Sequence, residues 1–198
     1  MLTTIMSYYP ITWDTSSALR MTINSDNSIT SNATDNFNAR IQSTTQIDNT
    51  QDAKFVLQSS SAGDNMLHFG LGKDPFPGGA TTEYDSIEYG CYLNGSTWSV
   101  KDGSSYQSVS TTGSYTDTVE FKRETGNIIK LYINSSLEHT YSNPSSDSDD
   151  LYIHVTGKGS SSVLVETTVE SASSSSDSVN AHAHLKPLQV FRRQRDWF

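Results

Sequence analysis

Aromatic rings and planar polar side chains gather in the middle of this sequence, between residues 76 and 115. The candidate ligand-binding residues in this stretch are Phe76, Tyr84, Asp85, Asn94, Trp98, Asp102, Tyr106 and Tyr115. Aromatic faces can stack on the C–H surface of a sugar ring, and amides or carboxylates can bind its hydroxyl groups. Trp98 and Tyr115 alternate in phase with apolar neighbours, so the alternative for these two is a place in the core. The pattern indicates a candidate carbohydrate site.

Patterns for nucleophilic catalysis or metal binding are missing from the sequence. The chain has five His residues, three of them inside strand-like runs, and it lacks the G-x-S-x-G sequence that positions a serine nucleophile. His182 and His184 have no third ligand nearby, and the acidic run at 147–150 lacks the glycine and final Glu of a calcium loop. Cys91, the single cysteine, lies in an apolar strand and excludes an intrachain disulfide. We predict no catalytic residue, no metal site and no cofactor.

The elements that must position the candidate residues are β-strands. Apolar and polar side chains alternate from residue 118 to 123 and again from 128 to 133, with a Gly-Asn break between the two runs. After a second break, Leu137, His139 and Tyr141 are expected to share one side of a third strand. Period-two alternation interrupted by turns predicts an antiparallel meander with one apolar face. Because no stretch before residue 171 keeps a helical period, the covering layer must be a second sheet.

About eleven strand-length runs separated by turn residues predict an all-β, antiparallel two-sheet sandwich. We expect one sandwich domain over residues 1–170, with residues 1–13 as a packing arm. The Ser-rich composition of residues 171–180 is typical of a linker. Residues 181–198 form a basic and aromatic tail that we expect to dock on a partner. The docking candidates are Leu188, Phe191, Arg192, Arg193, Arg195, Trp197 and Phe198.

Charge is unevenly distributed along the chain. Residues 1–180 contain nine Lys and Arg against twenty-one Asp and Glu, whereas residues 181–198 contain four Arg and Lys against one Asp. An acidic body repels nucleic acid, whose recognition needs a basic surface. No window is apolar enough to span a membrane, and residues 1–10 lack the features of a signal peptide. We therefore expect no nucleic-acid partner through the body, no membrane span, and assembly in the cytoplasm.

Five strand motifs follow one another in order along residues 69–137. They are F-G-L-G-K at 69–73, D-S-I-E-Y-G-C-Y-L at 85–93, W-S-V-K-D-G at 98–103, Y-T-D-T-V-E-F-K-R at 115–123 and N-I-I-K-L-Y-I-N-S-S-L at 127–137. Together they resemble the concanavalin A-like lectin/glucanase superfamily, in the SPRY-like and adhesin-like form of bacterial, phage and viral surface proteins. The resemblance covers residues 54–169. It implies a jelly-roll sandwich with any ligand at the loop end or on the concave sheet.

The chain departs from this superfamily at the residues that carry its chemistry. Legume-type lectins open a calcium and manganese site with Glu-x-Asp, but here Lys122 stands in place of that Asp and Arg123 follows it. A cation at this place repels a metal ion. The glucanase branch needs Glu-x-Asp-x-Glu along one strand, so that alternate carboxylates share a face, and the chain has no such run. The resemblance therefore implies a fold without the metal or the catalysis.

These observations favour a non-catalytic, lectin-like recognition module. We expect it to be a structural component of a larger surface assembly, such as a virion capsid, a spike or a tail fibre, in which it contacts glycans. Its tail is expected to bind other structural proteins, and its location is then a virion or an extracellular surface. The alternative is a capsid cement or decoration protein that binds no sugar. A glycoside hydrolase or lyase is the least favoured hypothesis.

Overall fold

The computed structural model describes residues 7–33, 37–49, 51–58, 66–73, 86–110, 112–126, 128–142 and 151–168. These residues form β-strands and turns, without an α-helix among them. The strands are β1 (Tyr8–Pro10), β2 (Met21–Ile23), β3 (Ile29–Ser31), β4 (Ala39–Ile47), β5 (Asp52–Leu57), β6 (Met66–Gly72), β7 (Tyr89–Asn94), β8 (Thr97–Asp102), β9 (Ser105–Ser110), β10 (Thr118–Glu124), β11 (Ile128–Ile133), β12 (Ser136–Thr140), β13 (Leu151–Lys158) and β14 (Ser162–Thr168). The predicted tail and linker lie outside the described residues.

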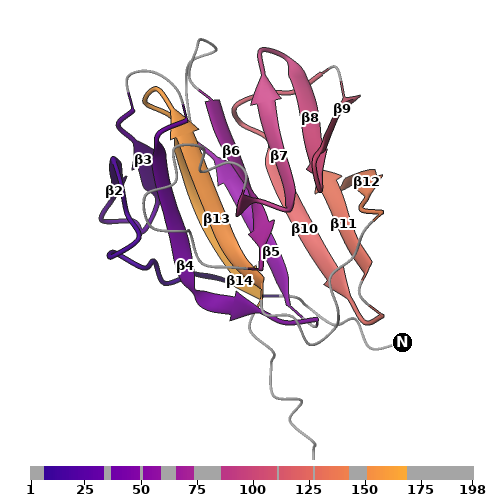
Figure 1. Cartoon of the computed structure of the whole chain (residues 1–198), viewed down its shortest axis with the longest axis horizontal. Helices are drawn as coiled ribbons and strands as arrows, with labels where there is room; N and C mark the ends of the chain where they lie inside the picture. The colour runs from indigo at the N-terminus through magenta and orange to yellow at the C-terminus, as the bar shows by residue number, and fades with distance from the viewer. Residues whose placement is uncertain are drawn as a thin grey trace, which may run out of the picture.

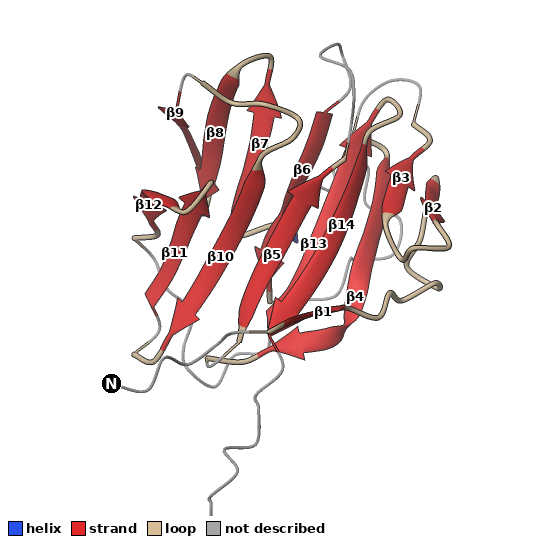
Figure 2. Ribbon diagram, turned by 180° about the vertical axis from the view of Figure 1, so that it is seen from behind, coloured by secondary structure: helices blue, strands red, loops and turns tan. Residues whose placement is uncertain are grey.

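The strands build two antiparallel sheets that lie one behind the other (Figure 1). The eight-stranded sheet has the order β12-β11-β10-β5-β14-β3-β2, with β1 paired to β14. The six-stranded sheet has the order β4-β13-β6-β7-β8-β9. Figure 2 shows the molecule from behind, with β9 and β12 along the same side of both layers. The predicted all-β two-sheet sandwich is confirmed.

The core lies between the sheets and follows from the alternation of side chains. In β10, Val119 and Phe121 point inward, while their outward neighbours remain in contact with solvent. Phe55 of β5 stacks on Phe69 of β6 with ring centroids 4.6 Å apart, and it meets Phe121 edge-on at 5.5 Å. All three rings are fully buried. Each such burial stabilises the fold by about 1.5–3 kcal/mol, so these rings join the two sheets.

The predicted hairpin forms between β10 and β11, with Val119 opposite Ile133. The third strand of the meander differs from expectation at Leu137, which is 52% exposed. Leu131 pairs with His139 and Tyr132 pairs with Leu137, so Glu138 is an extra residue in β12. A β-bulge of this kind reverses the side on which the preceding residues project. The prediction that Leu137 shares the apolar face was therefore wrong, whereas Tyr141 is buried as expected.

Two further register shifts lie at the borders of the six-stranded sheet. Between Trp98 and Ser99 of β8, the partner strand β9 contains one extra residue. Between Tyr152 and His154 of β13, the partner strand β4 is also longer than β13. In the described part of the chain, β4, β9 and β12 are thus edge strands that each join their sheet through an irregular ladder.

No described helix is long and apolar enough to span a bilayer.

Candidate functional site

The outer face of the six-stranded sheet brings together residues from four strands. Inward residues of β6 and β7 pack in the core, so the alternate residues His68 and Tyr92 point outward. These two are direct partners in the β6–β7 ladder. In the next ladder, Lys101 of β8 lies opposite Tyr106 of β9. Side chains separated by up to 38 positions in the sequence therefore share one surface.

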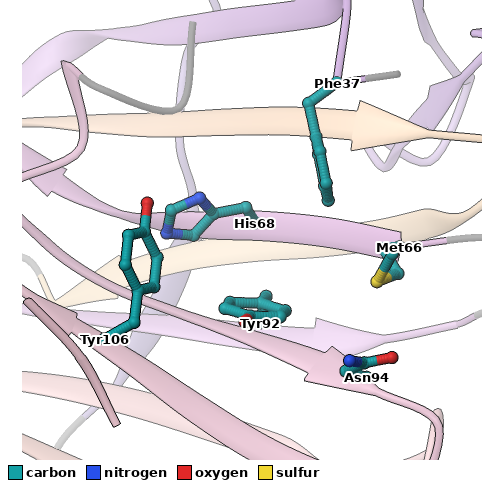
Figure 3. Close-up of a pocket in the computed structure, with 6 residues that line it drawn as sticks. All are labelled: Phe37, Met66, His68, Tyr92, Asn94 and Tyr106. Carbon is teal, nitrogen blue, oxygen red and sulfur yellow. The ribbon is translucent and has the colours of Figure 1, made fainter. Parts of the chain in front are cut away.

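This surface contains a hollow of about 360 Å³, open to solvent. Figure 3 shows His68 and Tyr106 at one end, Met66 and Asn94 at the other, and the Tyr92 ring between them. The lining residues are Phe37, Met66, His68, Tyr92, Asn94 and Tyr106. The size matches small-molecule sites, which occupy about 300–1,000 Å³ and combine mostly apolar walls with a few polar groups.

Three rings of the hollow contact one another. The centroids of His68 and Tyr92 lie 5.6 Å apart, those of Tyr92 and Tyr106 6.1 Å, and those of His68 and Tyr106 6.3 Å. The first two pairs are edge-to-face, which is a favourable geometry for aromatic quadrupoles. Tyr106 is 46% exposed, so much of its ring remains available to a ligand. The rings hold one another in place and leave an aromatic surface on the outside.

His68 contributes a neutral imidazole to this hollow. Burial, and secondly the nearby Lys101 ammonium, lower the pKa of His68 to about 3. The ring is therefore uncharged at neutral pH, with one nitrogen that donates and one that accepts hydrogen bonds. Asn94 adds an amide with both capacities at the opposite end. The hollow thus combines aromatic surface with uncharged polar groups.

A second hollow of about 380 Å³ adjoins the first at Tyr106, which lines both. Its lining residues are Glu88, Lys101, Gly103, Ser104 and Tyr106. Lys101 Nζ donates a hydrogen bond to the Ile87 carbonyl oxygen at 2.7 Å, and the Gly103 amide donates to the Glu88 carbonyl oxygen at 3.1 Å. The segment before β7 is therefore attached to β8, and it forms one wall of this hollow.

Asn94 and Tyr106 are the sequence candidates that lie in the aromatic hollow. Trp98 is fully buried, and its indole nitrogen donates a hydrogen bond to Asp117 Oδ2 at 2.8 Å. A ring without exposed surface cannot stack on a sugar, so Trp98 belongs to the core. Tyr115 packs against the core as well, and burial raises the pKa of its phenol. Trp98 and Tyr115 alternate in phase with apolar neighbours, and the alternative prediction based on this pattern, a place in the core, is the correct one for both.

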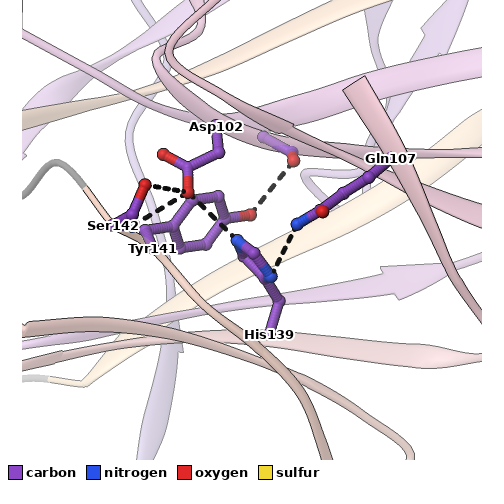
Figure 4. Close-up of polar contacts among 6 residues, drawn as sticks. Asp102, Gln107, His139, Tyr141 and Ser142 are labelled. Atoms are coloured by element: carbon purple, nitrogen blue, oxygen red, sulfur yellow. Dashed lines mark hydrogen bonds and ion pairs between the residues drawn. The ribbon is translucent and has the colours of Figure 1, made fainter. Parts of the chain in front are cut away.

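Asp102 takes part in a network that joins the two sheets (Figure 4). Its Oδ2 accepts hydrogen bonds from the Ser142 hydroxyl at 2.8 Å and the Ser142 amide at 2.9 Å, and it lies 3.2 Å from His139 Nε2. Burial alone raises the pKa of Asp102, but these bonds outweigh it and hold the pKa below its usual range. Tyr141 crosses the core to donate to the Gly90 carbonyl at 3.0 Å. Asp102 therefore connects β8 to the end of β12.

The remaining candidates lie outside the described residues. These are Phe76, Tyr84 and Asp85, together with the tail residues Leu188, Phe191, Arg192, Arg193, Arg195, Trp197 and Phe198. Sequence reasoning did not select Phe37, Met66, His68 or Tyr92. The sequence did contain a signal for His68 and Tyr92, because both alternate with the apolar core residues of their strands.

Comparisons with known proteins identify the architecture. No protein-family model and no curated protein matches the chain. The TRIM65 PSpry domain is similar in structure, with a TM-score of 0.54 and 8% identity over 79% of this chain and 89% of that one. The carbohydrate-binding module CBM66 from Bacillus subtilis has a TM-score of 0.50 and 8% identity over 80% of this chain and 97% of its own. The protein has the concanavalin A-like fold.

A sialidase has the same concanavalin A-like sandwich as one part of a larger chain. Its TM-score is 0.50 with 12% identity over 73% of this chain, but the match spans only 15% of the sialidase. At sequence identities of 8–12%, the structural similarity establishes the fold alone. The nature of any ligand must be argued from the residues of the site.

Lys122 and Arg123, the two cations that the sequence resemblance set against the metal site of legume-type lectins, project to opposite sides of β10. Lys122 points outward, 3.8 Å from Glu120. Arg123 is buried and donates from its guanidinium to the Ile47 carbonyl oxygen. Within the described residues, no three His, Cys, Asp or Glu side chains are grouped in a way that fits a metal ion.

Proposed function

We propose that this protein is a non-catalytic recognition module that binds carbohydrate in the aromatic hollow. The observation that carries the proposal is the contact of three rings, His68, Tyr92 and Tyr106, beside the Asn94 amide on one open surface. Sugars offer a C–H face to aromatic rings and hydroxyl groups to amides, and this hollow supplies both partners. The shared fold with a carbohydrate-binding module supports the same proposal.

The composition of the hollow also favours binding over hydrolysis. Glycoside hydrolases use two carboxyl groups on either side of the scissile bond, at about 5–9.5 Å from each other. The described residues that line the aromatic hollow include no Asp or Glu. Among the described residues that line the neighbouring hollow, Glu88 is the one carboxylate, and Lys101 lines the same hollow. We therefore propose that the protein holds its ligand without cleaving it.

A glycan array tests the proposal with the purified full chain. We expect Tyr92→Ala and Tyr106→Ala each to weaken glycan binding about tenfold or more, because each removes a stacking surface. Tyr9→Ala is the matched control, since Tyr9 is 50% exposed on β1 of the other sheet. Circular dichroism and thermal melting check that all three variants fold. If the wild-type protein binds no glycan, the proposal is wrong and a purely structural role, such as cement in a capsid, takes its place.

The wider role we propose is that of a surface component of a larger assembly, such as a virion or fibre. It rests on the charge contrast between the acidic body and the basic, aromatic segment 181–198. Opposite charge and aromatic residues in the sequence suit binding to a partner protein. Deletion of residues 179–198 tests this role, because it should leave folding intact and abolish incorporation into the assembly.

A further inference from the structure

The two hollows on the outer face of the six-stranded sheet share a single residue, Tyr106. Its position follows from the ladder, because Tyr106 lies opposite Lys101 on the edge strand β9. On one side, its ring contacts His68 and Tyr92, which belong to the aromatic hollow. The same side chain borders the hollow that contains Lys101 and Ser104. A ligand that reaches from one hollow to the other must therefore pass Tyr106.

The hollows have similar size and complementary chemistry. Their volumes are about 360 Å³ and about 380 Å³. Each volume lies at the lower end of the range for ligand sites, about 300–1,000 Å³, so each hollow suits a small unit. The first offers rings and the Asn94 amide, whereas the second offers the Glu88 carboxylate, the Lys101 ammonium and the Ser104 hydroxyl. Such groups bind the hydroxyls of a sugar, and the rings bind its C–H face.

We infer that the site takes an oligosaccharide of at least two sugar units, with Tyr106 between the first unit and the second. This inference rests on the proposed function and adds the length of the ligand to it. One unit lies in the aromatic hollow against Tyr92, and the next lies beside Ser104. A monosaccharide contacts the residues of only one hollow, so it does not gain the contacts with the residues of the other.

A length-graded glycan array tests the inference. It carries glucose, galactose, mannose and N-acetylglucosamine, each as the free unit and as chains of two, three and four units. For the wild-type protein, we expect at least one series in which the two-unit chain binds about tenfold or more tightly than the single unit. Chains beyond the length that fills both hollows should gain little.

The variant Ser104→Trp tests the second hollow separately from the first, because the indole would fill the space beside Tyr106 in the second hollow. Ser104 is exposed in the turn between β8 and β9, so the fold should tolerate the change. We expect it to remove the gain from the second unit and to leave single-unit affinity unchanged. Ser25→Trp, at an exposed turn of the other sheet, should keep the full gain. Glu88→Gln is a milder second variant that should reduce the gain if Ser104→Trp fails to fold.

The possible outcomes distinguish this inference from the proposed function. If single units and longer chains bind equally well, the second hollow is not a subsite, but carbohydrate binding stands. If Ser104→Trp weakens single units and longer chains by the same factor, the division into two subsites is also wrong. If no series binds at any length, the proposed function fails, and the inference fails with it.

Discussion

Charged side chains on the outer face of the eight-stranded sheet pair with one another. Lys54 binds Glu166 at 3.3 Å, and Lys130 binds Glu124 at 2.8 Å. On the outer face of the six-stranded sheet, the equivalent alternation presents His68, Tyr92 and Tyr106 instead. Paired surface charges satisfy each other and bring little specificity. The rings of the six-stranded sheet instead border a hollow of about 360 Å³ that is open to solvent, and Tyr106 among them is 46% exposed. This contrast is the reason why we propose the six-stranded sheet as the recognition face.

The largest expected effect concerns the six-stranded sheet, at the point where Gly70 of β6 lies opposite Gly90 of β7. A Cβ atom on Gly70 would lie 2.1 Å from the Tyr89 carbonyl oxygen, which belongs to the backbone of β7. We expect Gly70→Ala to lower the free energy of unfolding by at least about 3 kcal/mol, because the backbone must shift. Thr118→Ala on the other outer face should cost less than about 1 kcal/mol. Urea denaturation measures both, and equal losses would show that the two faces are packed alike.

The next effect concerns a buried carboxylate on the charged face. Asp52 is 5% exposed, and burial raises its pKa to about 6, against the opposing effect of Lys122. The native state therefore holds a proton that the unfolded chain releases between about pH 4 and 6, so stability falls as pH rises through this window. We expect Asp52→Asn to stabilise the protein by about 1 kcal/mol at pH 8 and to have no effect at pH 3.5.

Thermal melting at the two pH values measures the effect of Asp52→Asn. Asp48→Asn, at an exposed position, is the control and should show no such difference. A loss of stability at pH 8 would instead mean that the Asp52 carboxylate is needed as a charged acceptor for the Arg123 amide.

Removal of a charge from the eight-stranded face should have a small effect. We expect Lys54→Gln to cost about 0.5 kcal/mol or less, since the pair that it forms with Glu166 is partly exposed. Glycan binding should be unchanged, in contrast to Tyr106→Ala. Isothermal titration with an array-selected glycan compares the two variants. Weaker binding by Lys54→Gln would extend the site beyond the six-stranded sheet.

The smallest expected effect is an absence of pH dependence in binding. Because the pKa of His68 is lowered to about 3, its ring stays neutral from pH 5 to pH 8. We expect the affinity for an array-selected glycan to change less than about twofold over this range. A titration near pH 6 would show that His68 is charged in the ordinary way and that the hollow is more solvated than its burial indicates.

The two-sheet sandwich was predictable from the sequence because the alternation that selects the core side chains is a local pattern. Residues 118–133 fix which side chains enter the core, and the turn at Gly126 joins neighbouring strands. The side of the sheet on which Leu137 lies was predicted wrongly, because the extra residue Glu138 is recognisable only from the pairing of β12 with β11. A count of alternating residues cannot reveal such a shift.

The site was predictable only in part because it depends on pairing between distant strands. Asn94 and Tyr106 were selected from their types and their proximity in sequence. Alternation places His68 and Tyr92 on outer faces, but it does not tell that β6 and β7 are neighbours. Trp98 was ambiguous in the sequence, because an indole ring is equally suited to stack on a sugar and to pack in a core. Its complete burial in the fold decides for the core.

The irregular ladders of β4, β9 and β12 affect how this molecule behaves at high concentration. A sheet border with evenly spaced backbone donors and acceptors is a template on which another chain can grow into a fibre. Within the described residues, extra residues interrupt that spacing at β4, β9 and β12, and the other edge strands, β1 and β2, are only three residues long each. Pairing between the described edges of two copies is therefore disfavoured.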